Sequence, residues 1–165
     1  MGGFIPYKNV DTLARGMAFL DGYRLHIMSG IEDSDRERLT KLAPAGSLVF
    51  HDGASDEEYF ALLNSAVALV TASRDEGFGL PLVEAMGVGT PVVASDIPVF
   101  REIGADAVVF FPSDDAEAFA ARVRSLEDPA EWARRSQLSI AAAEPFRWEE
   151  SARRLLVFLT DVAAR

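Results

Sequence analysis

The sequence predicts an α/β fold, a doubly wound parallel sheet with helices on both faces. Three observations support this fold class: strand and helix patterns alternate along the chain, the connections between them are short, and 165 residues suit one domain. Parallel strands need a crossover between them, and a helix is the usual crossover. A domain of this size buries roughly 70% of the surface of its unfolded chain, so we expect one well-packed core.

The first half of the chain alternates between the two patterns from its start. Residues 2–6 read as the end of a strand, and Asn9 is placed to cap the helix that follows. Ser55 and Glu58 form a capping-box pattern ahead of an apolar run. We expect strands at 23–29, 47–51 and 66–71, and helices at 10–20, 33–42 and 55–65.

The second half continues the alternation and then becomes helical. Pro81, Pro98 and Pro129 each suit the first turn of a helix. We expect strands at 91–95 and 107–111, and helices at 80–86, 98–103, 113–126, 129–143 and 148–162.

Charge and composition disfavour several classes of protein. The net charge of -10 gives a negative field that repels nucleic acid and anionic lipid. The chain has no Cys, which excludes disulfides and Cys-ligated metals and fits a cytoplasmic location. Apolar runs such as 66–72 are far shorter than the roughly 20 residues of a membrane span, so we expect no transmembrane segment. With two His in the chain, no metal site is convincing.

The loop at 72–79 is the candidate ligand site, because ligands bind at the carboxyl ends of parallel strands. Gly77 and Gly79 let a ligand approach the backbone, and the amides at 80–82 open a helix and can bind phosphate. Glu76 and Glu84 suit the vicinal hydroxyls of a sugar and a ribose. The alternative is that the glycines form only a turn and the carboxylates favour the helix dipole, and spacing alone does not separate the two.

Other residues near this loop have structural interpretations. We expect Phe78, Leu82 and Met86 in the core, and Gly87 and Gly89 at a helix end and turn. His51 could contact a base or be a surface residue with Asp52 as its nearest partner, and His26 is expected to have no chemical role. Acidic residues at helix starts are expected to be solvated and to favour the dipole. They are Glu32, Asp33, Asp56, Glu57, Glu58, Asp114 and Asp115.

The string EGFGLPLVEAM at 76–86, followed by GTPVVAS at 89–95, resembles the signature of the family 4 retaining glycosyltransferases, the group 1 glycosyl transferases. The segments at 2–9 and 146–148 are similar to the family's strand-to-helix entry and to the start of its final helix. The resemblance implies a GT-B architecture of two Rossmann-like halves, in which the C-terminal half holds the nucleotide sugar. This chain resembles that half only.

The resemblance also implies a role for each matching residue. Glu76 would contact the hydroxyls of the donor sugar and Lys8 would neutralise the leaving diphosphate, which makes them the catalytic candidates. Glu84 would hold the ribose. The remaining donor-binding candidates are Gly3, His51, Ser73, Gly77, Phe78, Gly79 and Leu80. The family uses no bound metal, so we expect no metal or other cofactor.

Two departures from the family pattern leave details open. Gly3 stands where an Arg is common, so Lys8 would act alone or with Arg74; the alternative for Lys8 is a solvated loop residue. His51 and Asp52 stand where the family often has Gly, which leaves the base of the donor open.

The implied function is donor binding for a retaining hexosyl transfer from a nucleoside diphosphate sugar to an acceptor, in glycan or polysaccharide biosynthesis. Residues 1–165 would form one nucleotide-sugar-binding domain, whose final helix, 148–162, packs on it or toward a missing N-terminal Rossmann-like domain. The isolated chain would show little or no turnover. Apolar residues of the final helix predict weak association into a homodimer. These residues are Trp148, Leu155, Leu156 and Leu159.

Three other functions share parts of this pattern. The first is a non-catalytic nucleotide- or sugar-binding module, or half of a split enzyme. The second, a nucleotide-sugar epimerase, is disfavoured by the string around Glu76 and Glu84. The third, a phosphoacceptor signalling domain, would need an acidic pair after the first strand, and residues 5–8 supply none.

Overall fold

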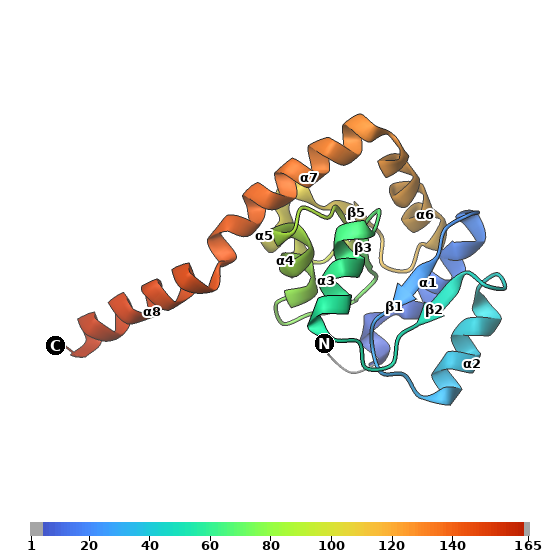
Figure 1. Ribbon diagram of the computed structural model, residues 1–165, viewed down its shortest axis with the longest axis horizontal. Helices are drawn as coiled ribbons and strands as arrows, with labels where there is room; N and C mark the ends of the chain where they lie inside the picture. The colour runs from blue at the N-terminus through green and yellow to red at the C-terminus, as the bar shows by residue number, and fades with distance from the viewer. Residues whose placement is uncertain (1–4, 164–165) are drawn as a thin grey trace.

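The computed structural model describes residues 5–163. Its strands are three or four residues long, and helices connect them (Figure 1). The strands are β1 (Leu25–Ile27), β2 (Leu48–Phe50), β3 (Leu69–Thr71), β4 (Val92–Ser95) and β5 (Val109–Phe111). The α-helices are α1 (Val10–Gly16), α2 (Asp33–Leu42), α3 (Asp56–Ser65), α4 (Leu80–Gly87), α5 (Pro98–Gly104), α6 (Ala116–Arg124), α7 (Pro129–Ala143) and α8 (Trp148–Ala163).

All strand pairs are parallel, but they form two sheets rather than one. β1 pairs with β2, with Leu25 opposite Leu48. β4 lies between β3 and β5, with its Val93 opposite both Val70 and Val109. The predicted α/β class is confirmed, whereas the expected continuous sheet is interrupted between β1 and β3.

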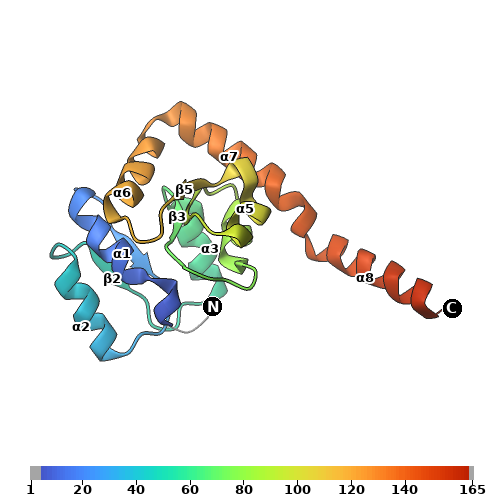
Figure 2. The same ribbon diagram turned by 180° about the vertical axis from the view of Figure 1, so that it is seen from behind.

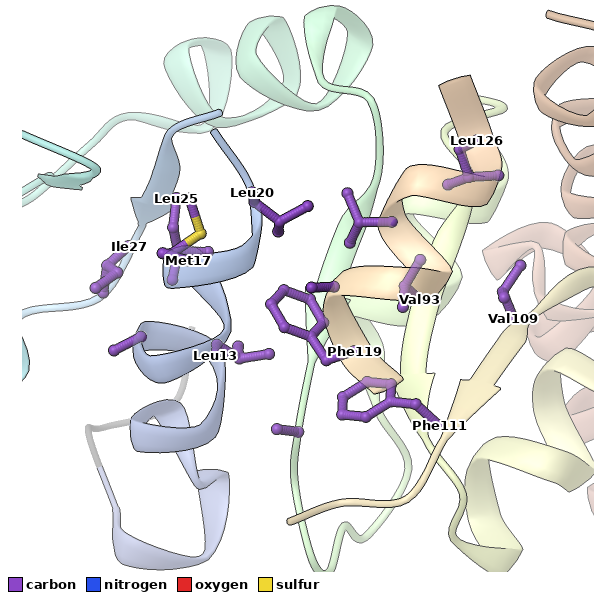
Figure 3. Packing of buried hydrophobic residues seen from close by; sticks show 14 of the residues in the cluster. Leu13, Met17, Leu20, Leu25, Ile27, Val93, Val109, Phe111, Phe119 and Leu126 are labelled. Atoms are coloured by element: carbon purple, nitrogen blue, oxygen red, sulfur yellow. The ribbon is translucent and has the colours of Figure 1, made fainter. Parts of the chain in front are cut away.

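Alternating side chains of β4 connect two apolar clusters, one on each face of the sheets. Val93 belongs to the cluster with α1 and α6, and Val92 belongs to the cluster with α4 and α5. Figure 3 shows the first cluster, in which Leu13 of α1 faces Phe119 of α6. All four residues of β4 are buried, so this strand is the centre of the domain.

Most predicted helices are confirmed within a few residues, and local capping explains where they begin. Ser55 Oγ accepts a hydrogen bond from the Glu58 amide, and the Glu58 carboxylate accepts one from the Ser55 amide, so the capping box is present. α6 begins at Ala116 rather than residue 113, because Asp115 accepts a bond from the Ala118 amide. β3 begins at Leu69 rather than at residue 66, and residues 66–68 form the connection from α3 to β3.

The start of the chain differs from the prediction where the structure describes it. Pro6 begins a short 3₁₀ helix, Pro6–Lys8, instead of ending a strand, and residues 2–4 of the predicted strand lie outside the described residues. Asn9 does precede α1, but its side chain does not cap the helix. Its backbone is left-handed, with φ of 50°. Its amide group instead contacts the loop after β5, as described below.

The last helix, α8, projects away from the rest of the molecule (Figures 1 and 2). It has no buried residue, and Trp148 at its start is 79% exposed. The sequence predicts that this helix packs either on the domain or toward an N-terminal domain. Packing on the domain is not observed. Its apolar residues Leu155, Leu156 and Leu159 are exposed. None of the described helices is long and apolar enough to cross a membrane.

Candidate functional site

Three segments meet at the carboxyl ends of β3 and β5: the stretch before α1, the loop after β3 and the loop after β5. The Arg74 amide donates to the Tyr7 carbonyl at 2.8 Å. Asn9 Nδ2 donates to the Ser113 carbonyl at 2.7 Å, and the Arg74 guanidinium binds the Asp114 carboxylate. These bonds join residues far apart in sequence, so they fix the three segments relative to one another.

Lys8 and Glu76, the two catalytic candidates, form an ion pair within this arrangement. Lys8 Nζ lies 2.5 Å from Glu76 Oε1, across 68 positions of sequence. Ser73 Oγ donates to the same carboxylate oxygen at 2.8 Å. The Glu76 side chain is only 11% exposed, so water screens this pair less than it screens a surface pair. The fold therefore holds a carboxylate and an ammonium together at the sheet edge.

Ser73 is a support for Glu76 rather than an exposed donor-binding group. Its side chain is fully buried, and its carbonyl accepts a hydrogen bond from Ser95 Oγ at 2.5 Å. Asp75 Oδ1 accepts a bond from the Glu76 amide at 2.9 Å. Sequence reasoning missed Ser95, whose signal is a polar residue at the end of an apolar strand. These bonds determine the path of the loop that carries Glu76.

The structure requires glycine at only one of the two glycine positions of the loop. Gly79 has φ of +92°, and a Cβ there would lie 2.8 Å from Cε1 of Phe100. The fold therefore requires glycine at position 79. A Cβ at Gly77 would meet no atom within 4 Å. Packing therefore does not require glycine at position 77.

The start of α4 offers fewer amide donors than the sequence suggested. Pro81 has no N–H, and the Leu82 amide already donates to the Gly79 carbonyl at 2.9 Å. The expected phosphate donors at 80–82 therefore reduce to Leu80, an exposed residue.

The structural expectations around this helix are confirmed with one exception. Leu82 and Met86 are buried, α4 ends at Gly87, and Gly89 has φ of +78°. Phe78, however, is 42% exposed and packs edge-on against Phe146. The prediction of Phe78 in the core is wrong, because Phe78 lies in the loop before α4 and not on the helix face that buries Leu82 and Met86. An exposed aromatic ring here is accessible to a ligand.

Glu84 lies on α4, where it accepts a hydrogen bond from Tyr59 of α3. Tyr59 Oη lies 2.9 Å from Glu84 Oε2, and the tyrosine ring is buried. Burial, and next the bond to Glu84 and its charge, raise the pKa of Tyr59. The tyrosine therefore stays a donor at neutral pH and orients the carboxylate. Sequence reasoning missed Tyr59, whose position gave only an apolar helix signal.

His51 lies at the end of β2 and contacts β1 rather than the Glu76 loop. Its Nε2 is 2.9 Å from His26 Nδ1, so His26 has a polar partner that the sequence did not indicate. Asp52, the expected partner of His51, instead pairs with Arg36 at 2.7 Å. Burial, and next the charges of His51 and Arg24, lower the pKa of His26.

The donor-binding candidate Gly3 lies outside the described residues.

Arg74, which could assist Lys8, forms an exposed ion pair with Asp114. Its guanidinium binds Asp114, and that hydrogen bond holds the pKa of the Asp114 carboxyl below its usual range. Asp114 is 65% exposed, as the sequence predicts, but it pairs with Arg74, and Asp115 rather than Asp114 caps α6. Among residues 5–163, no group of three or more His, Asp or Glu side chains is arranged to hold a metal ion.

The chain belongs to the group 1 glycosyl transferases, whose family model matches residues 1–144. It is 33% identical over 131 residues to the O-antigen chain mannosyltransferase RfbU of Salmonella typhimurium, covering 77% of this chain and 37% of the relative. It is 34% identical over 179 residues to the MMP alpha-(1->4)-mannosyltransferase of Mycolicibacterium hassiacum, covering 98% and 42%. The chain therefore spans about two fifths of the length of these relatives.

A solved structure also supports the assignment. The sucrose-phosphate synthase of Thermosynechococcus elongatus superposes with a TM-score of 0.82 and 30% sequence identity, covering all of this chain and 45% of that protein. This superposition supports the α/β fold of the chain.

Proposed function

We propose that this chain binds the nucleoside diphosphate sugar donor of a retaining glycosyltransferase, as the C-terminal, donor-binding half of that enzyme. The observation that carries the proposal is the Lys8–Glu76 pair, supported by Ser73 at the carboxyl ends of parallel strands. Membership of the glycosyl transferase family supports the same reaction class. A cation beside a hydroxyl-binding carboxylate suits a ligand that carries both phosphate and sugar.

Each group of the pair has a distinct part in this proposal. The Lys8 ammonium stabilises the negative charge that grows on the diphosphate as it leaves. Both contacts described for the Glu76 carboxylate use Oε1, so Oε2 is the oxygen assigned to the sugar hydroxyls. Glu84, oriented by Tyr59, accepts from the ribose hydroxyls. In this mechanism the leaving phosphate helps to deprotonate the acceptor, and neither an enzyme nucleophile nor a metal is required.

The acceptor site belongs, in this proposal, to an N-terminal Rossmann-like half. The chain spans 37% and 42% of two relatives, both named as mannosyltransferases. We propose a role in glycan or polysaccharide assembly, in the cytoplasm, and expect the isolated chain to bind the donor with little turnover. A nucleoside diphosphate mannose is the first donor to test, with each base in turn.

The test is a thermal-shift titration with uridine, guanosine and adenosine diphosphates and their sugars. Ligand at ten times its dissociation constant should stabilise the chain by about 1.4 kcal/mol, or roughly 3 to 6 °C. Glu84→Ala should weaken the shift at least about tenfold in concentration, whereas Glu117→Ala, on the exposed side of α6, should not. Equal shifts in both variants, or no shift at millimolar ligand, would contradict the donor site.

Turnover separates the proposal from a binding module. We expect sugar transfer when the chain is combined with an N-terminal half, and loss of that transfer in Glu76→Gln. Binding that persists without any transfer in the combined protein would instead favour a non-catalytic module.

We also propose weak self-association through the exposed apolar side of α8. Sedimentation at high concentration should show a dimer that Leu156→Glu removes. A strict monomer would contradict this part of the proposal.

A further inference from the structure

A series of polar side-chain contacts begins at Thr71, the last residue of β3, and ends at Lys8. Thr71 Oγ1 lies 3.1 Å from Ser73 Oγ, and Ser73 Oγ lies 2.8 Å from Glu76 Oε1. Lys8 Nζ reaches the same carboxylate oxygen at 2.5 Å. Thr71 is the one member of this series to which the proposed function gives no part.

The chemistry of the four groups fixes the direction of each hydrogen bond in the series. The carboxylate of Glu76 only accepts hydrogen bonds, and the ammonium of Lys8 only donates them. The Ser73 hydroxyl has a single proton, which it donates to Glu76. The contact between Thr71 and Ser73 is therefore a hydrogen bond in which Thr71 is the donor.

The burial of Ser73 makes the bond from Thr71 important. Ser73 is fully buried, so water does not offer its hydroxyl oxygen a substitute for this bond. A serine hydroxyl without such a partner readily turns to a backbone group nearby. A hydroxyl that accepts a hydrogen bond also donates more strongly, because successive hydrogen bonds polarise one another. Thr71 therefore holds the Ser73 oxygen in place and strengthens its bond to Glu76.

The buried central strand β4 fixes the positions of both hydroxyl residues. Thr71 lies opposite Ala94 of β4, and Ser95 Oγ, one residue further along β4, donates to the Ser73 carbonyl at 2.5 Å. Thr71 and Ser73 are two positions apart, the spacing at which side chains of a strand lie on one side. Threonine is also branched at Cβ, which restricts its χ1 rotation. The pairing of β3 with β4 therefore keeps the two hydroxyls within hydrogen-bonding distance.

The bond from Ser73 determines which oxygen of Glu76 is left for a ligand. Rotation about the last side-chain bond of a glutamate exchanges its two carboxylate oxygens, and this rotation has no sharp preference of its own. A donor held on Oε1 opposes the rotation and keeps Oε2 directed at the sugar. In the proposed function Lys8 turns to the diphosphate, so Ser73 is the contact that remains on Oε1 when the donor is bound.

We propose that Thr71 is a positioning residue for the donor sugar. It does not touch the ligand, and it acts through Ser73 on the orientation of the Glu76 carboxylate. The inference rests on the proposed function, because it requires a sugar at Glu76. The loss of the Thr71 hydroxyl should therefore affect binding of the sugar part of the donor and leave binding of the diphosphate, which is assigned to Lys8, unchanged.

The test compares Thr71→Val, which removes the hydroxyl, with Thr71→Ser, which keeps it. Each protein is titrated by calorimetry with uridine, guanosine and adenosine diphosphates and with the mannose conjugate of each. We expect Thr71→Val to weaken binding of the sugar conjugate by about threefold to tenfold and binding of the diphosphate by less than about twofold. Thr71→Ser should bind both ligands within about twofold of the unmodified protein.

A double substitution tests whether Thr71 acts through Glu76. In a Glu76→Ala background, adding Thr71→Val should weaken the sugar conjugate by less than about twofold further, because the carboxylate that Thr71 positions is gone. A full additional loss there would overturn the inference. So would an equal loss for diphosphate and conjugate, or no loss, in the single variant. If the unmodified chain bound none of the diphosphates, the proposed function would fail, and the sugar site that Thr71 positions would fail with it.

Discussion

The three-stranded part of the molecule and the two-stranded part differ in how their loops are held. At the carboxyl ends of β3 and β5, Arg74, Asp114 and Asn9 tie distant segments together around Glu76. At the end of β2, the His26–His51 pair links only neighbouring strands. β4 is buried along its whole length, whereas every residue of β2 is partly exposed.

This difference shows where the fold can hold charged groups in fixed positions. A central buried strand supports loops on both of its sides, so long-range bonds can form between those loops. In a two-stranded sheet, no strand has a paired neighbour on both of its sides. We therefore propose that the functional side chains lie in the three-stranded part. Substitutions in both parts of the molecule test this proposal.

Gly79→Ala should have the largest effect. The new Cβ would meet Phe100 at 2.8 Å in a left-handed backbone, so we expect a loss of about 2 to 4 kcal/mol in the free energy of unfolding. Urea denaturation measures this loss. Gly77→Ala, where a Cβ meets nothing within 4 Å, is the control and should change the stability by less than about 1 kcal/mol. Similar losses at both positions would show that the loop is not anchored as described.

Tyr59→Phe should have an intermediate effect. Removing the hydroxyl leaves Glu84 without this donor, and we expect a loss of about 1 kcal/mol at neutral pH. The native pKa of Tyr59 is raised, so the stability it contributes is present below pH 10 and falls as the pH rises above that value. The free energy of unfolding of the unmodified protein should therefore decline more steeply above pH 10 than that of the variant. Parallel pH profiles would contradict the raised pKa.

His26→Gln tests the two-stranded part, with a smaller effect. The native pKa of His26 is lowered, so its contribution to stability is present above about pH 6.5 and is lost as the pH falls. The variant should lose less stability than the unmodified protein between pH 7 and pH 5, as measured by urea denaturation. Nucleotide shifts should be equal in the two proteins. A reduced shift in the variant would instead connect this pair to the donor site.

Arg74→Gln should have the smallest effect on stability. The Arg74 and Asp114 side chains are largely exposed, so we expect a change within about 0.5 kcal/mol. Nucleotide affinity should also change little, because the proposed function assigns the diphosphate charge to Lys8. Lys8→Gln provides the contrast, with an expected loss of affinity of about tenfold or more by isothermal titration. Equal losses in the two variants would mean that Arg74 shares the diphosphate.

Local signals in the sequence were sufficient for much of the fold. The capping box of Ser55 and Glu58 and the prolines at helix starts place the helices, because these signals act within one turn. The break between β1 and β3 could not be predicted, because strand pairing depends on contacts far apart in the chain.

The candidate site shows the same limit. The spacing of Glu76 and Glu84 indicated the site. Their hydrogen bonds to Lys8, Ser73 and Tyr59 could not be predicted, because they depend on how the chain folds. The exposure of Phe78 likewise depends on the turn at Gly79, which composition does not reveal.

The projecting helix α8 has a geometric consequence for anything that binds it. It contains 16 residues, and at 1.5 Å per residue it is about 24 Å long. Because the helix is rigid along its axis, a contact near Val162 lies at a fixed reach from the connection at Arg147. A small change of backbone angle at that connection would move the far end through many times the distance. The length of α8 therefore sets how far its end lies from the domain, and the few residues between α7 and α8 set its direction.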